Sequence, residues 1–294
     1  MIGRVRTNGV EIAYESFGSQ EGRPLLLIMG LGSQLIHWDE DFCGSLVDLG
    51  HYVVRFDNRD AGESTHFHEA GMPDLAAALG GQVDAAYLLT DMAADVIGLL
   101  DALDLANVHL VGVSMGGMIA QTIAVAAPER VRSLTSIMST PAPHIGAPTP
   151  EALGALLSPP VGNREAAIER ALQAWSLMGS KGYPMDVERI ARVTGLAYDR
   201  AYDPAGTARQ LMAVLASGDR SEGLRGLDVP ALVIHGEDDL LIQLPGGVAT
   251  AEAIPGAKLL TFPGMGHDLP RDLWPVITDA IAGLTALAER EAAV

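Results

Sequence analysis

Residues 109–120 read H-L-V-G-V-S-M-G-G-M-I-A and contain the pattern G-x-S-x-G from Gly112 to Gly116, with Ser114 at its centre. An apolar run precedes the serine, and small and apolar residues of helical character follow it. This strand–turn–helix context is typical of a nucleophile elbow, in which flanking glycines let a serine occupy a strained turn. A phosphate-binding loop is the alternative, but the serine precedes the glycine pair and no lysine follows it. The motif therefore predicts Ser114 as a nucleophile.

Apolar runs and amphipathic segments alternate on both sides of this motif. Because uninterrupted apolar runs are typical of strands covered on both faces, strands are predicted at residues 24–29, 52–56, 108–113, 134–138, 231–234 and 258–262. Helices are predicted at residues 91–103, 115–127 and 274–288. Asn8-Gly9, between two alternating runs, predicts an N-terminal hairpin. This order of segments predicts an α/β fold with a mostly parallel, doubly wound sheet.

The alternation stops between about residue 140 and residue 225. This segment begins with a stretch rich in proline and glycine and continues with helical patterns at residues 164–178 and 204–216. A run of ordinary crossover helices is the alternative, but the segment is too long for one crossover. We therefore predict a helical cap at residues 140–225, inserted into a core formed by residues 1–139 and 226–294.

A nucleophilic serine needs a base, and the base needs an acid that orients it. His267 follows the last predicted strand in F-P-G-M-G-H, where two glycines allow the loop to bend over the sheet. The acid is expected after a strand, between Ser114 and His267 in the chain. The run V-I-H-G-E-D-D supplies it, and we choose Asp239, with Asp238 as the second choice. The segment after the preceding strand, S-T-P-A-P-H, has no carboxylate, which favours Asp239.

The oxyanion that forms during acyl transfer needs two backbone N–H donors. We assign one to Met115, directly after the nucleophile, and the other to Leu31 in the loop M-G-L-G-S-Q. A plain glycine turn is the alternative for that loop. The expected substrate contacts are Gly30 in the same loop, Trp38, and Trp175 in the predicted cap. For Trp175, a position in the core of the cap is the alternative.

With these residues in place, the chain resembles the α/β-hydrolases over almost its whole length and is particularly similar to anthracycline (aclacinomycin) methylesterases. The resemblance implies the α/β-hydrolase fold. Met29 stands where the family commonly has a histidine, but the backbone donor of the loop is unaffected. The motifs that carry the resemblance are L-I-M-G-L-G-S at 27–33, F-D-N-R-D-A-G-E-S at 56–64, V-G-V-S-M-G-G-M at 111–118, V-I-H-G-E-D-D at 233–239 and G-M-G-H at 264–267.

These residues predict a serine carboxylic ester hydrolase that acts on a hydrophobic ester through an acyl-enzyme intermediate. Ser114 excludes the epoxide hydrolases and haloalkane dehalogenases of this fold, because they use an aspartate at this position. Two alternatives stay open. One is a carbon–carbon bond hydrolase, because the S-M-G-G motif of this chain looks like the motif of those enzymes. The other is a non-catalytic ligand-binding homologue, against which the complete set of three residues argues.

Composition limits the partners. The chain has 37 acidic and 19 basic residues, and its net charge of −18 disfavours nucleic acid and anionic membranes. Its one cysteine, Cys43, cannot form an intrachain disulfide, and the N-terminus has no apolar signal segment. We therefore expect a cytoplasmic protein with a small-molecule substrate, either as a monomer or as a homodimer.

Neither a cofactor nor a metal is expected, because the three catalytic candidates supply their own base. The segment D-N-R-D-A-G-E-S contains Asp57, Arg59 and Asp60. We interpret these three residues as members of ion pairs that brace a loop. His66 and His68 follow as an H-x-H pair on a polar stretch. No Cys/His/Glu cluster accompanies this pair in the sequence, so it is not expected to bind a metal.

Overall fold

An eight-stranded sheet runs through the part of the chain that the computed structural model describes, residues 2–292. The strands are β1 (Ile2–Thr7), β2 (Val10–Phe17), β3 (Arg23–Ile28), β4 (His51–Phe56), β5 (Val108–Val113), β6 (Val131–Ile137), β7 (Ala231–Gly236) and β8 (Lys258–Phe262). Their order across the sheet is β1-β2-β4-β3-β5-β6-β7-β8. The pairings of β1 with β2 and of β2 with β4 are antiparallel, and the others are parallel. The predicted mostly parallel α/β sheet is therefore confirmed.

The N-terminal hairpin and the central strands follow from local sequence. Asn8 and Gly9 have φ angles of 46° and 80°, which a two-residue hairpin turn requires, and Thr7 pairs with Val10. Strands β4, β5 and β7 are buried along their whole length. Their mainly apolar character is explained by helices on both faces of the sheet.

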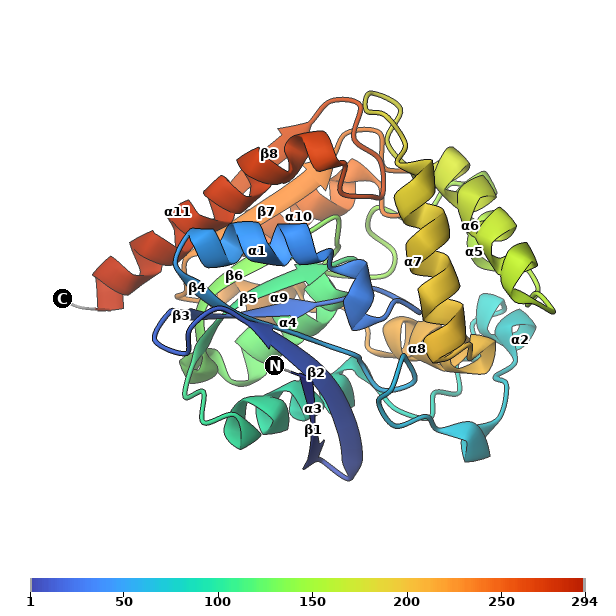
Figure 1. Ribbon diagram of the computed structural model, residues 1–294, viewed down its shortest axis with the longest axis horizontal. Helices are drawn as coiled ribbons and strands as arrows, with labels where there is room; N and C mark the ends of the chain where they lie inside the picture. The colour runs from blue at the N-terminus through green and yellow to red at the C-terminus, as the bar shows by residue number, and fades with distance from the viewer. Residues whose placement is uncertain (1, 293–294) are drawn as a thin grey trace.

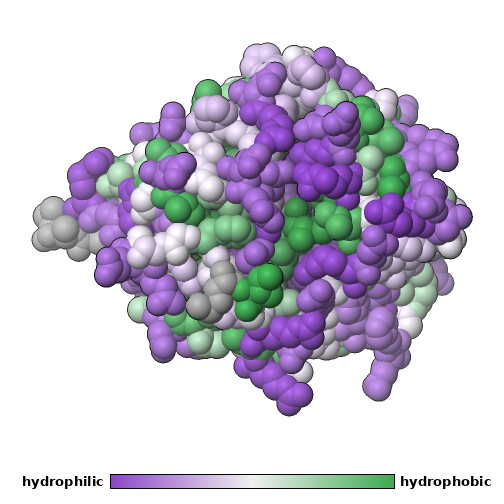
Figure 2. Space-filling view, viewed as in Figure 1, coloured by the Kyte–Doolittle hydropathy of each residue, from purple (hydrophilic) through white to green (hydrophobic). Residues whose placement is uncertain are grey.

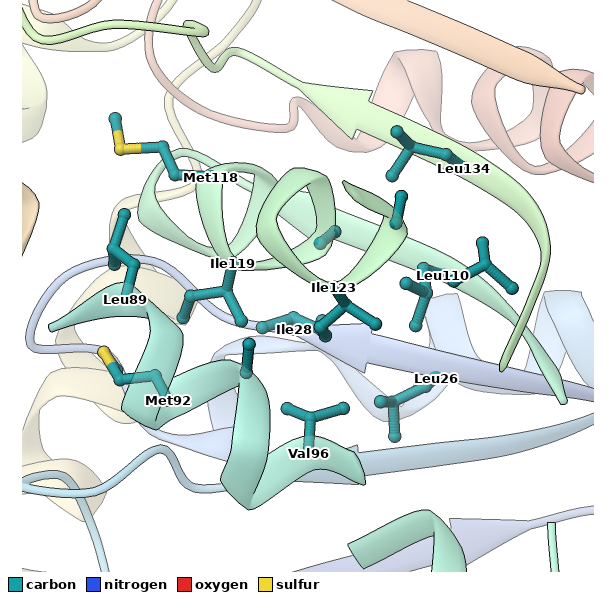
Figure 3. Packing of buried hydrophobic residues seen from close by; sticks show 14 of the residues in the cluster. Leu26, Ile28, Leu89, Met92, Val96, Leu110, Met118, Ile119, Ile123 and Leu134 are labelled. Atoms are coloured by element: carbon teal, nitrogen blue, oxygen red, sulfur yellow. The ribbon is translucent and has the colours of Figure 1, made fainter. Parts of the chain in front are cut away.

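Helices cover both faces of the sheet (Figure 1), and two hydrophobic clusters hold them against it. One face packs against α3 (Leu89–Ala102), α4 (Met115–Ala126), α9 (Ser221–Arg225) and α10 (Leu244–Ala253). The other packs against α1 (Glu40–Asp48) and α11 (Trp274–Ala292). Figure 3 shows Ile119 and Ile123 of α4 lying against Ile28 of β3 in the first cluster. Each such side chain contributes roughly 1.5–3 kcal/mol when it is fully buried, so the clusters fix α4 and the strand ends beside it.

Within the described residues, the segment between β6 and β7 contains helices and no strand. It holds α5 (Pro150–Leu156), α6 (Arg164–Met178), α7 (Val187–Arg200), α8 (Pro204–Ala216) and the short α9. In Figure 1, α5 to α8 lie together beyond one end of the strands, with α2 (Leu75–Leu79) beside α8. The helical character predicted for this segment agrees with the structure, while its division into a cap at 140–225 and a core stays a prediction.

Ion pairs tie the loop after β4 to other elements. Among them are Asp57–Arg200, Asp60–Arg209 and Arg59–Asp95, with N···O distances of 2.9, 2.7 and 2.6 Å. The first two reach α7 and α8, and the third reaches α3. The sequence interpretation of pairs that brace the loop therefore understates their reach, because each partner lies on a distant segment that the sequence pattern alone does not place.

The surface is mainly hydrophilic. On the face shown in Figure 2, hydrophobic residues form small groups separated by hydrophilic ones. Among residues 2–292, no helix combines the length and the apolar character that crossing a bilayer requires.

The remaining short elements are the 3-10 helices η1 (Leu35–His37), η2 (His68–Ala70), η3 (Pro128–Arg130) and η4 (Arg271–Leu273).

Candidate active site

Ser114 lies in a sharp turn between β5 and α4. Its φ of 54° and ψ of −122° are strained for a residue with a side chain. The two flanking glycines are required by close packing, because a Cβ atom on Gly112 would collide with the carbonyl of Gly116, and one on Gly116 with the carbonyl of Ile28. The hydroxyl of Ser139 donates a hydrogen bond to the carbonyl of Ser114 at 2.8 Å. The elbow predicted from the sequence thus has the expected geometry.

The structure brings Ser114, His267 and Asp239 together from three different loops. Nε2 of His267 lies 3.1 Å from Oγ of Ser114. Nδ1 of the same ring lies 2.7 Å from Oδ2 of Asp239. These loops follow β5, β8 and β7, whose parallel pairing puts their carboxyl ends at one edge of the sheet, where open α/β sheets bind ligands.

Asp239 is held in place by its own loop. Its Oδ1 accepts hydrogen bonds from the amides of Leu241 and Ile242 at 2.8 and 3.0 Å, which leaves Oδ2 for His267. The carboxylate is buried, whereas the residue weighed as the second choice, Asp238, is exposed. The geometry therefore favours Asp239 over Asp238 as the partner of His267.

The loop after β3 forms a tight turn next to the serine. The amide of Ser33 donates to the carbonyl of Gly30 at 3.2 Å, and Gly32 at the third position of this turn has a φ of 64°, which favours glycine. The predicted oxyanion donors are the amides of Leu31 in this turn and of Met115 at the start of α4. Neither amide donates to an acceptor within the described residues, and both residues border the same cavity.

A cavity of about 650 Å³ opens onto Ser114 and His267. Its walls are mostly apolar and come from the core loops and from α5 to α8. Gly30, Trp38 and Trp175, the substrate contacts expected from the sequence, all border it. A Cβ atom on Gly30 would lie 3.2 Å from the Cβ of Ser114, so a side chain there would crowd the serine.

Residues 23–270 match the family described as the alpha/beta hydrolase fold. The chain belongs to this family. This α/β-hydrolase is 29% identical to rhodomycin D methylesterase DauP of Streptomyces sp. (strain C5), with 93% of this chain and 94% of the relative covered. It is also 29% identical to rhodomycin D methylesterase DnrP of Streptomyces peucetius, over 97% of this chain and 98% of that protein.

Among solved structures, the enol-lactonase of Burkholderia xenovorans LB400 is similar, with a TM-score of 0.73 and 25% sequence identity. The match covers 97% of this chain and 100% of the enol-lactonase chain. Together these matches confirm the predicted fold and the predicted resemblance to methylesterases. The chain is therefore a hydrolase of the α/β fold that has methylesterase homologues.

The sequence analysis assigned no role to two supporting residues of this α/β-hydrolase site. Gln210 of α8 accepts a hydrogen bond from the amide of Gly32 at 2.8 Å and donates to the carbonyl of Arg59 at 2.7 Å, so it fixes the turn that carries Leu31. His235 donates from Nε2 to the carbonyl of Ile242 at 2.7 Å and thereby closes the loop of the acid. Burial lowers the pKa of His235, which keeps this ring neutral. Gln210 acts through contacts with distant segments, whereas His235 contacts a residue only seven positions along the chain.

The fold brings an acidic residue to the H-x-H pair, and whether the pair binds a metal stays a prediction. An acidic partner does accompany His66 and His68, because Asp203 at the start of α8 lies against them. Asp203 is remote in the sequence and carries no motif, so only the packing of α8 on the core reveals the cluster.

Proposed function

We propose that this α/β-hydrolase is a serine carboxylic ester hydrolase. The observation that carries the proposal is the continuous contact from Ser114 through His267 to Asp239, with distances of 3.1 and 2.7 Å, at the edge of a large apolar cavity. This arrangement is the one that nucleophilic acyl transfer needs, since a base must reach the hydroxyl and an acid must orient the base.

The proposed reaction has two steps. In acylation, His267 takes the proton of Ser114 as Oγ attacks the ester carbonyl, and the imidazolium then gives this proton to the departing alcohol. In deacylation, His267 takes a proton from water, which attacks the acyl-enzyme and releases the acid while Oγ recovers its proton. The amides of Leu31 and Met115 stabilise the oxyanion of both tetrahedral intermediates.

The proposed substrate is a hydrophobic ester with a bulky acyl part. A mostly apolar cavity of about 650 Å³ supports this choice, because burial of apolar surface would provide the binding energy. Two relatives that are 29% identical over nearly the whole chain are named as methylesterases, which makes methyl esters of bulky acids the first class to test.

A substrate panel tests this function. Methanol release from methyl esters of small and multi-ring acids is compared with cleavage of a dienone that carbon–carbon hydrolases of this fold accept. We expect hydrolysis of the esters, with a higher kcat/KM for the bulky ones. Cleavage of the dienone without ester hydrolysis would establish the carbon–carbon alternative, and binding without turnover of any compound would establish a ligand-binding protein.

Replacing Trp175 by alanine is expected to change substrate preference. Trp175 borders the cavity on α6, within the predicted cap. The variant should lower kcat/KM for bulky aromatic esters relative to acetate esters by roughly tenfold to a hundredfold, the range of a lost apolar contact of about 1–3 kcal/mol. Steady-state kinetics on both ester types gives this ratio.

Leu196→Ala is the matched control, because Leu196 is an exposed apolar residue of α7 in the same helical segment and does not border the cavity. The control should keep the wild-type ratio. If Trp175→Ala also keeps it, α6 does not choose the substrate, and specificity lies in the core loops around Leu31 and Trp38.

A further inference from the structure

Two histidines and an aspartate meet outside the active-site cavity. Nδ1 of His66 lies 2.8 Å and Nδ1 of His68 lies 3.7 Å from the same oxygen, Oδ2 of Asp203. The two imidazole rings are stacked, with centroids 5.2 Å apart and planes 10° apart. One donor atom from each of the three side chains lies within 4.8 Å of the others. None of the three residues borders the cavity that contains Ser114.

The hydrogen bond on the far side of His66 gives this geometry its meaning. Nε2 of His66 lies 2.9 Å from the carbonyl oxygen of Gly62, which can only accept. A neutral ring therefore keeps its hydrogen on Nε2 and directs the lone pair of Nδ1 at the carboxylate of Asp203. Two electron-pair donors 2.8 Å apart need a cation between them, either a metal ion or the second proton of the ring. A backbone carbonyl that holds the outer N–H is also one of the usual partners of a histidine that binds a metal.

One oxygen of Asp203 faces the two imidazoles. Its Oδ1 caps α8 by accepting the amide of Gly206 at 2.9 Å. Its Oδ2 receives the two imidazoles and also Arg209 at 3.0 Å. Arg209 has a second partner, because its Nη2 lies 2.7 Å from Oδ1 of the buried Asp60. The two carboxylates and one guanidinium leave the cluster with a surplus negative charge, which tolerates a bound cation.

We propose that His66, His68 and Asp203 form a binding site for a divalent transition-metal ion that joins the loop after β4 to the start of α8. Two imidazole nitrogens and one carboxylate oxygen suit zinc and its neighbours, with water completing the coordination. Ligand atoms about 2.0–2.1 Å from such an ion lie at most about 4.2 Å apart. The side chain of His68, which is 74% exposed, can close the remaining gap by a small rotation.

A metal at this site would act on stability rather than on catalysis. Its ligands come from the core loop and from α8, the helix that also supplies Gln210 to the turn of Leu31. An ion bound to the folded chain only would raise the melting temperature as its concentration rises. The hydrolysis step would not need it, because none of the ligands borders the cavity around Ser114.

Zinc titration of the purified, chelator-treated full chain tests the proposal. Calorimetry and a metal assay after dialysis should give one zinc ion per chain, and the melting temperature should rise with zinc. His68→Ala and Asp203→Asn should weaken binding at least tenfold and remove the shift in melting temperature. Asn can still cap α8, so the second variant removes the metal-binding charge while it keeps the helix start.

His144→Ala is the matched control, since His144 is an exposed histidine outside the cluster, and this variant should bind zinc as the wild type does. Zinc binding that is equally strong in His68→Ala and Asp203→Asn would place the ion elsewhere and overturn the proposal. No binding to the wild type would also overturn it and would leave a protonated His66 as the cation that faces Asp203. Ester hydrolysis should be the same with and without zinc, so the result is independent of the proposed function.

Discussion

Replacement of Ser114 by alanine is expected to lower kcat for ester hydrolysis by roughly 10⁶-fold, the loss known for a removed serine nucleophile. The reason is that Oγ of Ser114 is the atom within 3.1 Å of Nε2 of His267 at the cavity edge, so its removal leaves no group to form the acyl-enzyme. Steady-state assay of a hydrophobic methyl ester measures the effect.

The variant should remain folded. Alanine keeps the Cβ atom, and the hydrogen bond that the hydroxyl of Ser139 donates to the carbonyl of residue 114 is unaffected. Its circular dichroism spectrum and its melting temperature should therefore match those of the wild type within a few degrees. A folded variant with wild-type turnover would falsify the serine mechanism.

Removal of the base should be almost as damaging as removal of the nucleophile, and loss of the acid somewhat less so. His267→Ala is expected to lower kcat by roughly 10⁶-fold and Asp239→Asn by roughly 10⁴-fold. Asparagine keeps the shape of Asp239 but presents an N–H or an uncharged oxygen to Nδ1, so it no longer stabilises the imidazolium or fixes the productive tautomer. The double variant should lose no more than His267→Ala alone, because the residues act as a unit.

Asp238→Asn is the matched control for the acid. Asp238 is the adjacent carboxylate and is exposed, whereas Asp239 is buried against His267. We expect Asp238→Asn to keep kcat within about twofold to threefold, the usual range for a surface change without a catalytic contact. If Asp238→Asn disables the enzyme and Asp239→Asn does not, the assignment of the acid is wrong.

The sequence predicted the sheet well because its strands are read from local composition. The runs at β3, β4, β5 and β7 are mainly apolar, and the turn Asn8-Gly9 sets the first hairpin. The three catalytic candidates, Ser114, Asp239 and His267, could also be predicted from the sequence. Each follows a predicted strand, and they come in the chain order of this fold. Element ends were less accurate: the last helix continues to Ala292 and β6 begins at Val131, because helix and strand ends depend on packing.

Contacts between distant segments could not be predicted in this way. Gln210 supports the turn of Leu31 from α8, and Asp203 joins His66 from the start of the same helix. Neither residue belongs to a motif, and both lie in the helical segment between β6 and β7. The position of that segment depends on tertiary packing. Hydrophobic periodicity predicts that a segment is helical but does not predict which distant residues it contacts.

Covalent labelling is the most direct test of the central claim that Ser114 is the nucleophile. The wild type is treated with a fluorophosphonate that carries an apolar chain, digested, and analysed by peptide mass spectrometry. We predict one adduct per chain, on the peptide that contains Ser114, with no adduct in Ser114→Ala and slow labelling in His267→Ala. An adduct on another residue, or none on the folded and hydrolytically active wild type, would contradict the mechanism.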